Sequence, residues 1–303
     1  MVRIEQWDTP DGDFVEVARL APRGDVRTTP RLLLLHGLEG GLHSHYTRGL
    51  FREAAQRGWG MDLLLFRTCG PTPNRLPRSY HSGETSDPLF VIERLAAESS
   101  APLGVIGVSL GGNVLCKLLG EQGDALPEVM RGAVAVSVPF DLARASRWIG
   151  RGFGAVYEKA FLRSLIPKAL AKISRHAELS PLTSVQHART LWEFDDRFTA
   201  PLHGFHDAGD YYGRASSRAF VAEARRPLLL LSAVDDPFLP ADVLADVARS
   251  VKDNRHITVE FPRKGGHVGF VSGRSPWRPD YYGERRAVEF LDAHMVSGVA
   301  RVG

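Results

Sequence analysis

The chain has 303 residues, of which 44% are hydrophobic and 24% are charged, which is enough for one large domain with an insertion. Its formal net charge is only +3, and Lys and Arg are spread along the chain without a dense basic block, which argues against nucleic-acid binding. The two cysteines exclude a disulfide framework.

Short apolar segments indicate the strands of a sheet. They cover residues 14–20, 32–35, 61–66, 103–108, 133–138, 228–232 and 257–261. The first alternates apolar and polar residues after a Pro-Asp-Gly turn, so we expect it to be the second strand of an opening hairpin. The others are continuous apolar runs, which are typical of parallel strands covered on both faces.

Helical periodicity lies between these strands, at residues 46–57, 88–97, 113–119, 241–251 and 284–294. The alternation predicts a right-handed, doubly wound α/β sheet. It breaks once, where about ninety residues without a strand pattern exceed the usual length of a connection. That segment contains an amphipathic helix at 155–173 and an aromatic, acidic stretch at 191–212. We expect residues 141–222 to form a cap over the carboxyl edge of the sheet, inserted into a single domain that spans residues 1–303.

A candidate nucleophile lies between the strand at 103–108 and the helix that follows it. The segment reads Gly-Val-Ser-Leu-Gly-Gly-Asn, with Ser109 two residues from Gly107 and from Gly111. This spacing is typical of a tight, strained turn that projects the serine oxygen above the sheet. The N-terminus of the helix behind the serine favours the negative charge that develops during attack. We therefore predict that Ser109 is a catalytic nucleophile.

A second Gly-rich loop, His-Gly-Leu-Glu-Gly-Gly, follows the strand at 32–35. In hydrolases built on such a sheet, this loop supplies one backbone N–H to the oxyanion of the reaction, and the residue after the nucleophile supplies the other. Those residues are Leu38 and Leu110. Each such donor contributes about 3 kcal/mol to stabilising the transition state.

An acid and a histidine follow the last two strands. Asp235 and Asp236 come after the strand at 228–232, and His267 lies between glycines after the strand at 257–261. A carboxylate there can accept the Nδ1 proton of the histidine and stabilise the imidazolium. We favour Asp236, with Asp235 as the alternative. The chain order Ser109, Asp236, His267 is the order typical of hydrolases on this kind of sheet.

The sequence resembles the YheT-like branch of the α/β-hydrolases, which includes the eukaryotic ABHD1/2/3-type hydrolases and the yeast medium-chain ester synthases. The resemblance rests on the loop at 35–41 with His45-Tyr46, on the segments at 74–75 and 80–87, and above all on motifs at 193–196, 199–201, 204–205 and 211–212. It implies an α/β-hydrolase fold and hydrolysis of carboxylic esters, often acyl esters or lipids, with Ser109, Asp236 and His267 as the triad.

Several smaller interpretations accompany this hypothesis. Asp195 and Asp196 are expected to cap helices, and Tyr211 and Tyr212 to pack the cap on the core. Five histidines are candidates for the pocket lining: His43, His45, His81, His203 and His206. Cys116 is expected in the core, and Cys69 lacks a neighbour that would activate it.

Three alternatives stay open. The same residues could transfer an acyl group to an alcohol, or the chain could be a catalytically silent binding protein. The helix at 155–173 could also contact anionic lipid, because Lys159, Arg163, Lys168 and Lys172 are expected on its polar face.

The expected partner is a small-molecule or lipid ester, with no nucleic acid, no cofactor and no metal, and the sequence does not indicate an oligomeric state. The N-terminus lacks the apolar run of a signal peptide, and the longest apolar stretches, at 32–35 and 228–231, are far too short to cross a bilayer. We therefore expect a cytoplasmic protein.

Overall fold

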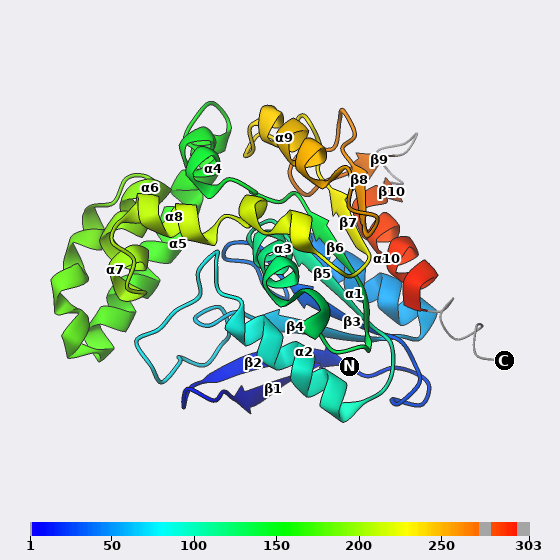
Figure 1. Cartoon of the computed structure of the whole chain (residues 1–303). Helices are drawn as coiled ribbons and strands as arrows, with labels where there is room; N and C mark the ends of the chain where they lie inside the picture. The colour runs from blue at the N-terminus through cyan, green and yellow to red at the C-terminus, as the bar shows by residue number, and fades with distance from the viewer. Residues whose placement is uncertain (1, 273–279, 296–303) are drawn as a thin grey trace.

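The computed structural model describes residues 2–272 and 280–295 and contains an eight-stranded sheet in the order β1-β2-β4-β3-β5-β6-β7-β8 (Figure 1). The strands are β1 (Val2–Asp8), β2 (Phe14–Leu20), β3 (Arg31–Leu35), β4 (Gly60–Leu65), β5 (Leu103–Val108), β6 (Met130–Val136), β7 (Leu228–Leu231) and β8 (Ile257–Glu260). Strands β1 and β2 form the predicted antiparallel hairpin, β2 is antiparallel to β4, and the remaining neighbours are parallel. The predicted mostly parallel, doubly wound sheet is therefore confirmed.

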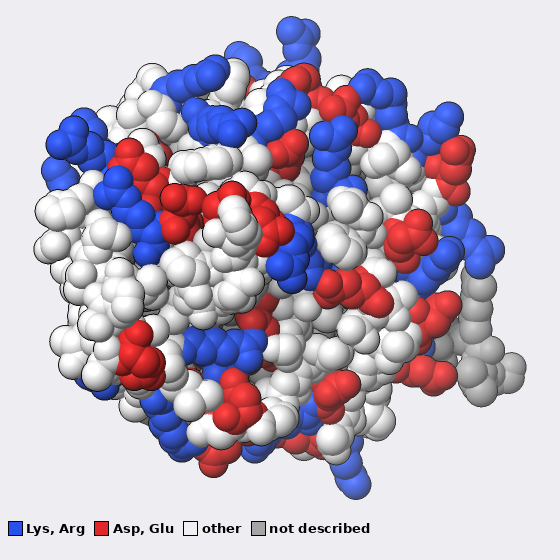
Figure 2. All heavy atoms as spheres, turned by 60° about the vertical axis from the view of Figure 1, so that its left-hand side comes forward, with Lys and Arg blue, Asp and Glu red and all other residues white. Residues whose placement is uncertain are grey.

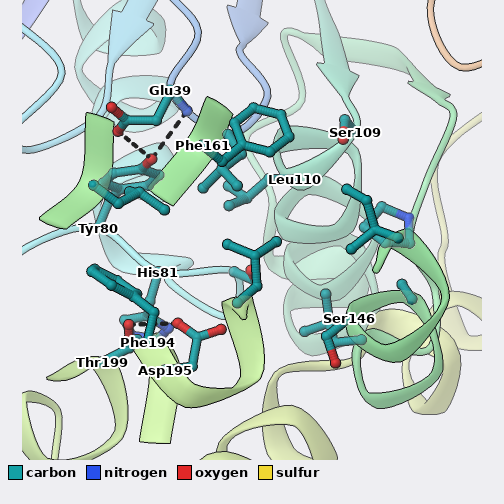
Figure 3. Close-up of a pocket in the computed structure, with 18 of the residues that line it drawn as sticks. Glu39, Tyr80, His81, Ser109, Leu110, Ser146, Phe161, Phe194, Asp195 and Thr199 are labelled. Carbon is teal, nitrogen blue, oxygen red and sulfur yellow. Dashed lines mark hydrogen bonds between the residues drawn. The ribbon is translucent and has the colours of Figure 1, made fainter. Parts of the chain in front are cut away.

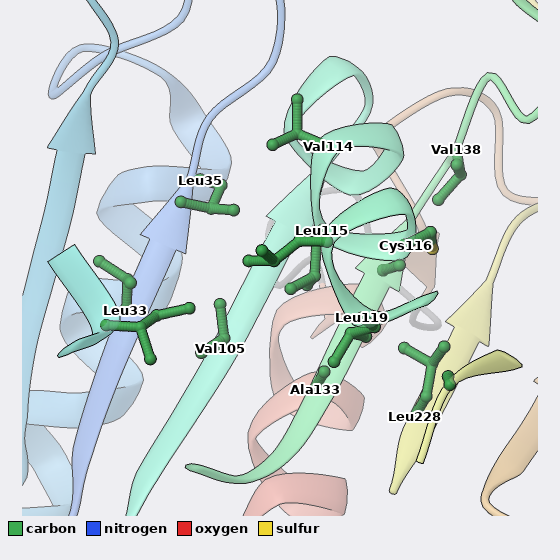
Figure 4. Close-up of a cluster of buried hydrophobic side chains, with 14 of the residues drawn as sticks. Leu33, Leu35, Val105, Val114, Leu115, Cys116, Leu119, Ala133, Val138 and Leu228 are labelled. Carbon is green, nitrogen blue, oxygen red and sulfur yellow. The ribbon is translucent and has the colours of Figure 1, made fainter. Parts of the chain in front are cut away.

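Helices cover both faces of this sheet because its central strands present apolar side chains on both faces. In β3, Leu33 and Leu35 belong to one buried cluster while Leu32 and Leu34 belong to the other. The first cluster contains side chains of α2 (Ser86–Glu98), α3 (Leu110–Gln122) and α9 (Ala241–Val251). The second contains side chains of α1 (His45–Arg57) and α10 (Tyr282–Met295). Figure 4 shows the first cluster, with α3 packed on β3, β5 and β6. Burial of one leucine contributes about 2 kcal/mol.

The long connection between β6 and β7 is helical and forms the cap, which lies beyond the carboxyl ends of the strands, on the left of Figure 1. Its helices are α4 (Leu142–Ile149), α5 (Gly154–Arg175), η2 (Ala177–His187), α6 (Leu191–Phe194), η3 (Asp195–Thr199), α7 (Ala200–Leu202), α8 (Ala208–Ala215), η4 (Ser217–Ala219) and η5 (Val221–Glu223). The cap has an apolar cluster of its own, in which α5 packs on η2 and on Phe194 and Phe198.

The remaining elements are short. They are η1 (Gly123–Ala125), β9 (Val271–Ser272) and β10 (Asp280–Tyr281), of which the last two pair in a separate antiparallel ladder. Within residues 2–272 and 280–295, no helix combines the length and the apolar character that a membrane crossing requires.

The helix predicted at 155–173 is α5, but the prediction that its four cations share an outer polar face is wrong. Lys172 is only 2% exposed, and its ammonium group donates hydrogen bonds to the carbonyl oxygens of Leu76 (3.0 Å) and Arg78 (2.9 Å). Lys168 turns toward the sheet and pairs with Glu39 at 2.8 Å. Of the four cations, Lys159 and Arg163 are exposed. Lys172 is tolerated in the interior because carbonyl oxygen atoms replace the water that its ammonium group loses, whereas the Lys168 side chain stays 40% exposed.

Candidate active site

Ser109 occupies a strained turn between β5 and α3, as predicted. Its backbone has φ 54° and ψ −117°, a conformation that residues other than glycine rarely adopt. The two flanking glycines are required by contact. A Cβ atom on Gly107 would lie 2.4 Å from the carbonyl oxygen of Gly111, and one on Gly111 would lie 2.2 Å from that of Leu35. Strand and helix can therefore approach closely enough to lift the serine hydroxyl above the sheet.

His267 and Asp236 meet Ser109 at the carboxyl edge of the sheet. Nε2 of His267 lies 2.9 Å from the hydroxyl oxygen of Ser109, and Nδ1 lies 2.7 Å from Oδ2 of Asp236. The Asp236 side chain is 1% exposed, and its other oxygen accepts the backbone N–H of Phe238 at 2.8 Å. The hydroxyl, the imidazole and the carboxylate are thus connected in a row. Along the chain, Ser109 and Asp236 are 127 positions apart, and Asp236 and His267 are 31 positions apart.

The loop that carries His267 is held by two side chains whose roles the sequence did not reveal. Asp235 accepts the backbone N–H groups of Gly265 and Gly266, each at 2.9 Å. Ser137, directly after β6, donates its hydroxyl to the carbonyl oxygen of His267. Ser137 is fully buried and has φ 53°, so its backbone is strained as well. The available signal for Ser137 was a polar residue inside the otherwise apolar run at 133–138.

Leu38 and Leu110 line the same pocket as Ser109. Within the described part of the chain, neither of their backbone N–H groups has a hydrogen-bond acceptor. The loop that carries Leu38 approaches the serine closely, since a Cβ atom on Gly37 would lie 3.3 Å from Cβ of Ser109. The hydroxyl of Tyr46 accepts the Gly37 N–H at 2.9 Å and fixes the loop there.

Glu39 connects this loop to the cap. Its φ of 55° is left-handed, and its N–H donates to the hydroxyl of Tyr80 at 3.1 Å. That hydroxyl donates in turn to Oε1 of Glu39 at 3.0 Å (Figure 3). From α5, Ser164 donates to Oε2 of Glu39, and Lys168 pairs with the same oxygen at 2.8 Å. A side chain next to Leu38 is therefore held by the sheet domain and by the cap together.

A pocket of about 1110 Å³, including its open mouth, lies between the cap and the sheet and contains Ser109 and His267. Near the serine its walls are apolar, as Leu110 and Phe161 show in Figure 3. Further apolar lining residues are Leu142, Ala145, Ile149, Leu165, Leu191, Phe194, Phe198, Phe238 and Leu239. The lining fits a hydrocarbon chain better than a charged group.

The end of the pocket away from Ser109 is polar and contains Asp195, His81 and Thr199 (Figure 3). Asp195 accepts hydrogen bonds from Thr199 (2.6 Å) and from the hydroxyl of Tyr212 (2.5 Å), so the prediction that it caps a helix is wrong. Burial raises the pKa of its carboxyl to about 6. Burial lowers the pKa of His81 to about 4, so its imidazole is neutral at pH 7.

The structure agrees with the predictions for Asp196 and Tyr211, whereas Tyr212 packs inside the cap and not on the core. Asp196 accepts the N–H of Ala208 at 3.0 Å, at the start of α8. Tyr212 is buried in the cap, and the buried Tyr211 accepts the N–H of Ser82 through its hydroxyl at 2.8 Å. The cap is thereby fastened to the loop before α2.

Of the five histidines considered for the pocket, only His81 lines it. His203 packs against His81 with ring centres 4.5 Å apart, while His43, His45 and His206 are exposed. Cys116 is fully buried, as expected. Burial raises the pKa of the Cys69 thiol to about 12, so this cysteine is a poor nucleophile at neutral pH. In the described ranges no group of His, Cys, Asp and Glu side chains has the arrangement of a metal site.

Comparisons with known proteins agree with this architecture. The alpha/beta hydrolase fold family matches residues 30–273. A protein of Escherichia coli that carries the name esterase YheT is 36% identical over 294 residues, which cover 96% of this chain and 85% of that protein. Mouse phospholipase ABHD3 is 29% identical over 98% of this chain and 72% of its own length. The crystal structure of the Pyrococcus furiosus esterase Pf2001 has the same fold, with a TM-score of 0.62, 16% identity, and coverage of 97% of this chain and 93% of that one.

Proposed function

The chain belongs to the α/β-hydrolase family, in its YheT-like branch, and we propose that it hydrolyses carboxylic esters with an apolar acyl group. The observation that carries the proposal is the contact of Ser109 with His267 at 2.9 Å, in a pocket whose neighbouring walls are apolar. Esterase and phospholipase are the activities that the names of two relatives state, and both break ester bonds.

The first half of the reaction acylates the serine. His267 removes the hydroxyl proton as the Ser109 oxygen attacks the ester carbonyl carbon. Asp236, 2.7 Å from Nδ1, accepts a hydrogen bond from the proton that Nδ1 carries, so that Nε2 is free to act as the base, and it stabilises the imidazolium that forms. The C–O bond to the alcohol then breaks, and the alcohol leaves with the proton that His267 returns. The product of this half is an acyl-serine.

The negative charge on the carbonyl oxygen is stabilised by two backbone donors, the N–H groups of Leu38 and Leu110. Both groups lack another acceptor in the described chain, and both residues line the pocket that contains the serine. Because they are fixed before the substrate arrives, little reorganisation opposes the charge as it forms. The same donors serve again in the second half, when water activated by His267 attacks the acyl-serine and releases the carboxylic acid.

The direct test is hydrolysis of a p-nitrophenyl ester series of increasing acyl length by the wild type and by Ser109→Ala. We expect p-nitrophenol release by the wild type, with kcat/KM rising as the acyl group lengthens into the apolar part of the pocket. Ser109→Ala should lose about 10⁴-fold or more in kcat. Equal activity of the two proteins would overturn the proposal.

A further inference from the structure

An exposed apolar patch lies where α4 ends and α5 begins. Its large side chains are Trp148, Phe153, Val156 and Tyr157, which are 38%, 67%, 61% and 42% exposed. Nine large hydrophobic side chains are exposed in the described part of the chain, and these four fall within ten consecutive residues. Single exposed hydrophobic residues are common, but a contiguous group marks an interaction surface.

Basic side chains border this patch. Arg147, Arg151, Lys159 and Arg163 are exposed, and none of them forms an ion pair with a described residue. The one acid between positions 147 and 163 is Glu158, which is 5% exposed and accepts the N–H of Leu191 at 2.9 Å. The surface is therefore both apolar and positive. In Figure 2, which brings the cap forward, Lys and Arg side chains lie along the upper edge of the molecule, with Asp and Glu side chains among them.

A series of aromatic contacts joins the patch to the reacting groups. The ring of Phe153 packs on that of Tyr157 with centres 5.4 Å apart, and Tyr157 packs on Phe238 at 4.8 Å. Phe238 lines the pocket and packs on the imidazole of His267 at 4.4 Å. The exposed patch is thus continuous with the pocket wall.

We propose that this α4–α5 patch docks the protein on a lipid bilayer that contains anionic headgroups, from which the ester substrate enters the pocket past Phe238. The proposal rests on the proposed ester hydrolysis. Aromatic side chains favour the boundary between headgroups and acyl chains, and the four bordering cations face the phosphates. A water-soluble partner would not need an apolar surface that continues into an apolar pocket. This patch differs from the polar face that the sequence predicted for α5, two of whose lysines turn inward.

The test is co-sedimentation of the full chain with vesicles of phosphatidylcholine alone, or of phosphatidylcholine and phosphatidylglycerol in equal parts. Binding is measured in the Ser109→Ala background so that the lipid stays intact. The test variant carries Phe153→Ser and Val156→Ser, which remove exposed apolar area without touching the pocket. The control carries Ile4→Ser and Val26→Ser, two exposed positions (44% and 51%) outside the cap.

The Ser109→Ala protein with no change in the patch should bind the mixed vesicles more tightly than the neutral ones. Its binding should weaken as the salt concentration rises. The test variant should lose about 10-fold or more in affinity, and the control should not. In the active background, the test variant should hydrolyse p-nitrophenyl butyrate in solution at the wild-type rate.

Two results would overturn the docking proposal: no binding of the wild-type sequence to either vesicle, or equal binding by the test variant. The protein could also fail to bind vesicles and instead form a dimer, detected by sedimentation velocity, that the test variant loses. That result would assign the patch to a second copy of the chain. Failure of the wild type to hydrolyse p-nitrophenyl butyrate is a separate result, which counts against the proposed function alone.

Discussion

Asp235 and Asp236 are neighbours in the sequence and fix the same loop in two different ways. Asp236 forms a hydrogen bond with the imidazole of His267 at 2.7 Å. Asp235 accepts hydrogen bonds from the backbone N–H groups of Gly265 and Gly266, which directly precede His267. One carboxylate orients the ring and the other orients the chain that carries it. The pair therefore separates an electrostatic role from a structural one at adjacent positions.

Asn substitutions distinguish these roles. Asp236→Asn removes the charge beside His267 and permits the wrong tautomer, so kcat should fall by about 10⁴-fold. Asp235→Asn keeps an oxygen that can accept both N–H groups, so kcat should change by less than about 10-fold. The measurement is steady-state hydrolysis of a p-nitrophenyl ester.

Thermal unfolding of both variants provides the control, since each should retain a cooperative transition. If Asp235→Asn were the more damaging of the two to kcat, with its fold intact, the assignment of the acid would be reversed.

Glu39 provides a second prediction, because it joins the loop of Leu38 to the cap. Lys168→Met removes one of its partners on α5 and leaves the buried carboxylate short of a cation. We expect kcat for a short ester to fall by about 10-fold, with little change in KM, because the displaced loop weakens one oxyanion donor. The matched control is Arg175→Met, an exposed cation at the end of the same helix. A change in KM alone would place Lys168 in substrate binding rather than in positioning the loop.

Local patterns account for what the sequence revealed. The continuous apolar runs predicted the central strands, and Gly107 and Gly111 predicted the turn at Ser109, because both signals are encoded within a few residues. The meeting of Ser109, Asp236 and His267 was also predictable, since each follows a strand and parallel strands end at one edge of the sheet.

Contacts between distant segments account for what the sequence did not reveal. Helical spacing alone put Lys172 on an outer face, but carbonyl groups of residues 76 and 78 receive it in the interior. Ser137 gives no pattern by itself, since its acceptor is a carbonyl 130 positions away. The role of Asp195 similarly depends on Tyr212, which reaches it only after α8 folds back on η3.

Asp195 makes stability depend on pH. Burial raises its pKa from the ordinary 3.8 to about 6 in the folded chain, so the folded state retains a proton that the unfolded state has lost between these values. Its contribution to stability is therefore complete below about pH 4 and declines until about pH 6, by at most about 3 kcal/mol. Asp195→Asn cannot ionise, so its stability relative to wild type should improve as the pH rises from 4 to 6.

Urea unfolding at a series of pH values measures this difference. Asp253→Asn, at an exposed aspartate, serves as the control and should follow the wild type. A constant difference between Asp195→Asn and wild type from pH 4 to 7 would contradict the raised pKa.

The turn at Ser109 predicts a strict requirement for glycine. In Gly111→Ala, the new methyl group would meet the carbonyl oxygens of Leu35 and His36 at 2.2 and 2.6 Å, so strand and helix must separate. We expect a loss of about 3 kcal/mol in the free energy of unfolding, together with loss of activity.

Gly213→Ala is the matched control, because Gly213 lies in α8 and a Cβ atom there would meet nothing within 4 Å. That substitution should raise the free energy of unfolding by about 0.5–1 kcal/mol. Equal stabilities of the two variants would show that the turn relaxes more easily than its contacts imply.

Covalent labelling of Ser109 tests the central claim most directly. The chain is incubated with a fluorophosphonate, digested, and the modified peptide is identified by mass spectrometry, with Ser109→Ala and His267→Ala treated in parallel. We predict one adduct, on Ser109, that is absent from Ser109→Ala and forms about 100-fold or more slowly in His267→Ala. An adduct on another residue, or a rate that His267→Ala leaves unchanged, would contradict the assignment of Ser109 as a nucleophile activated by His267.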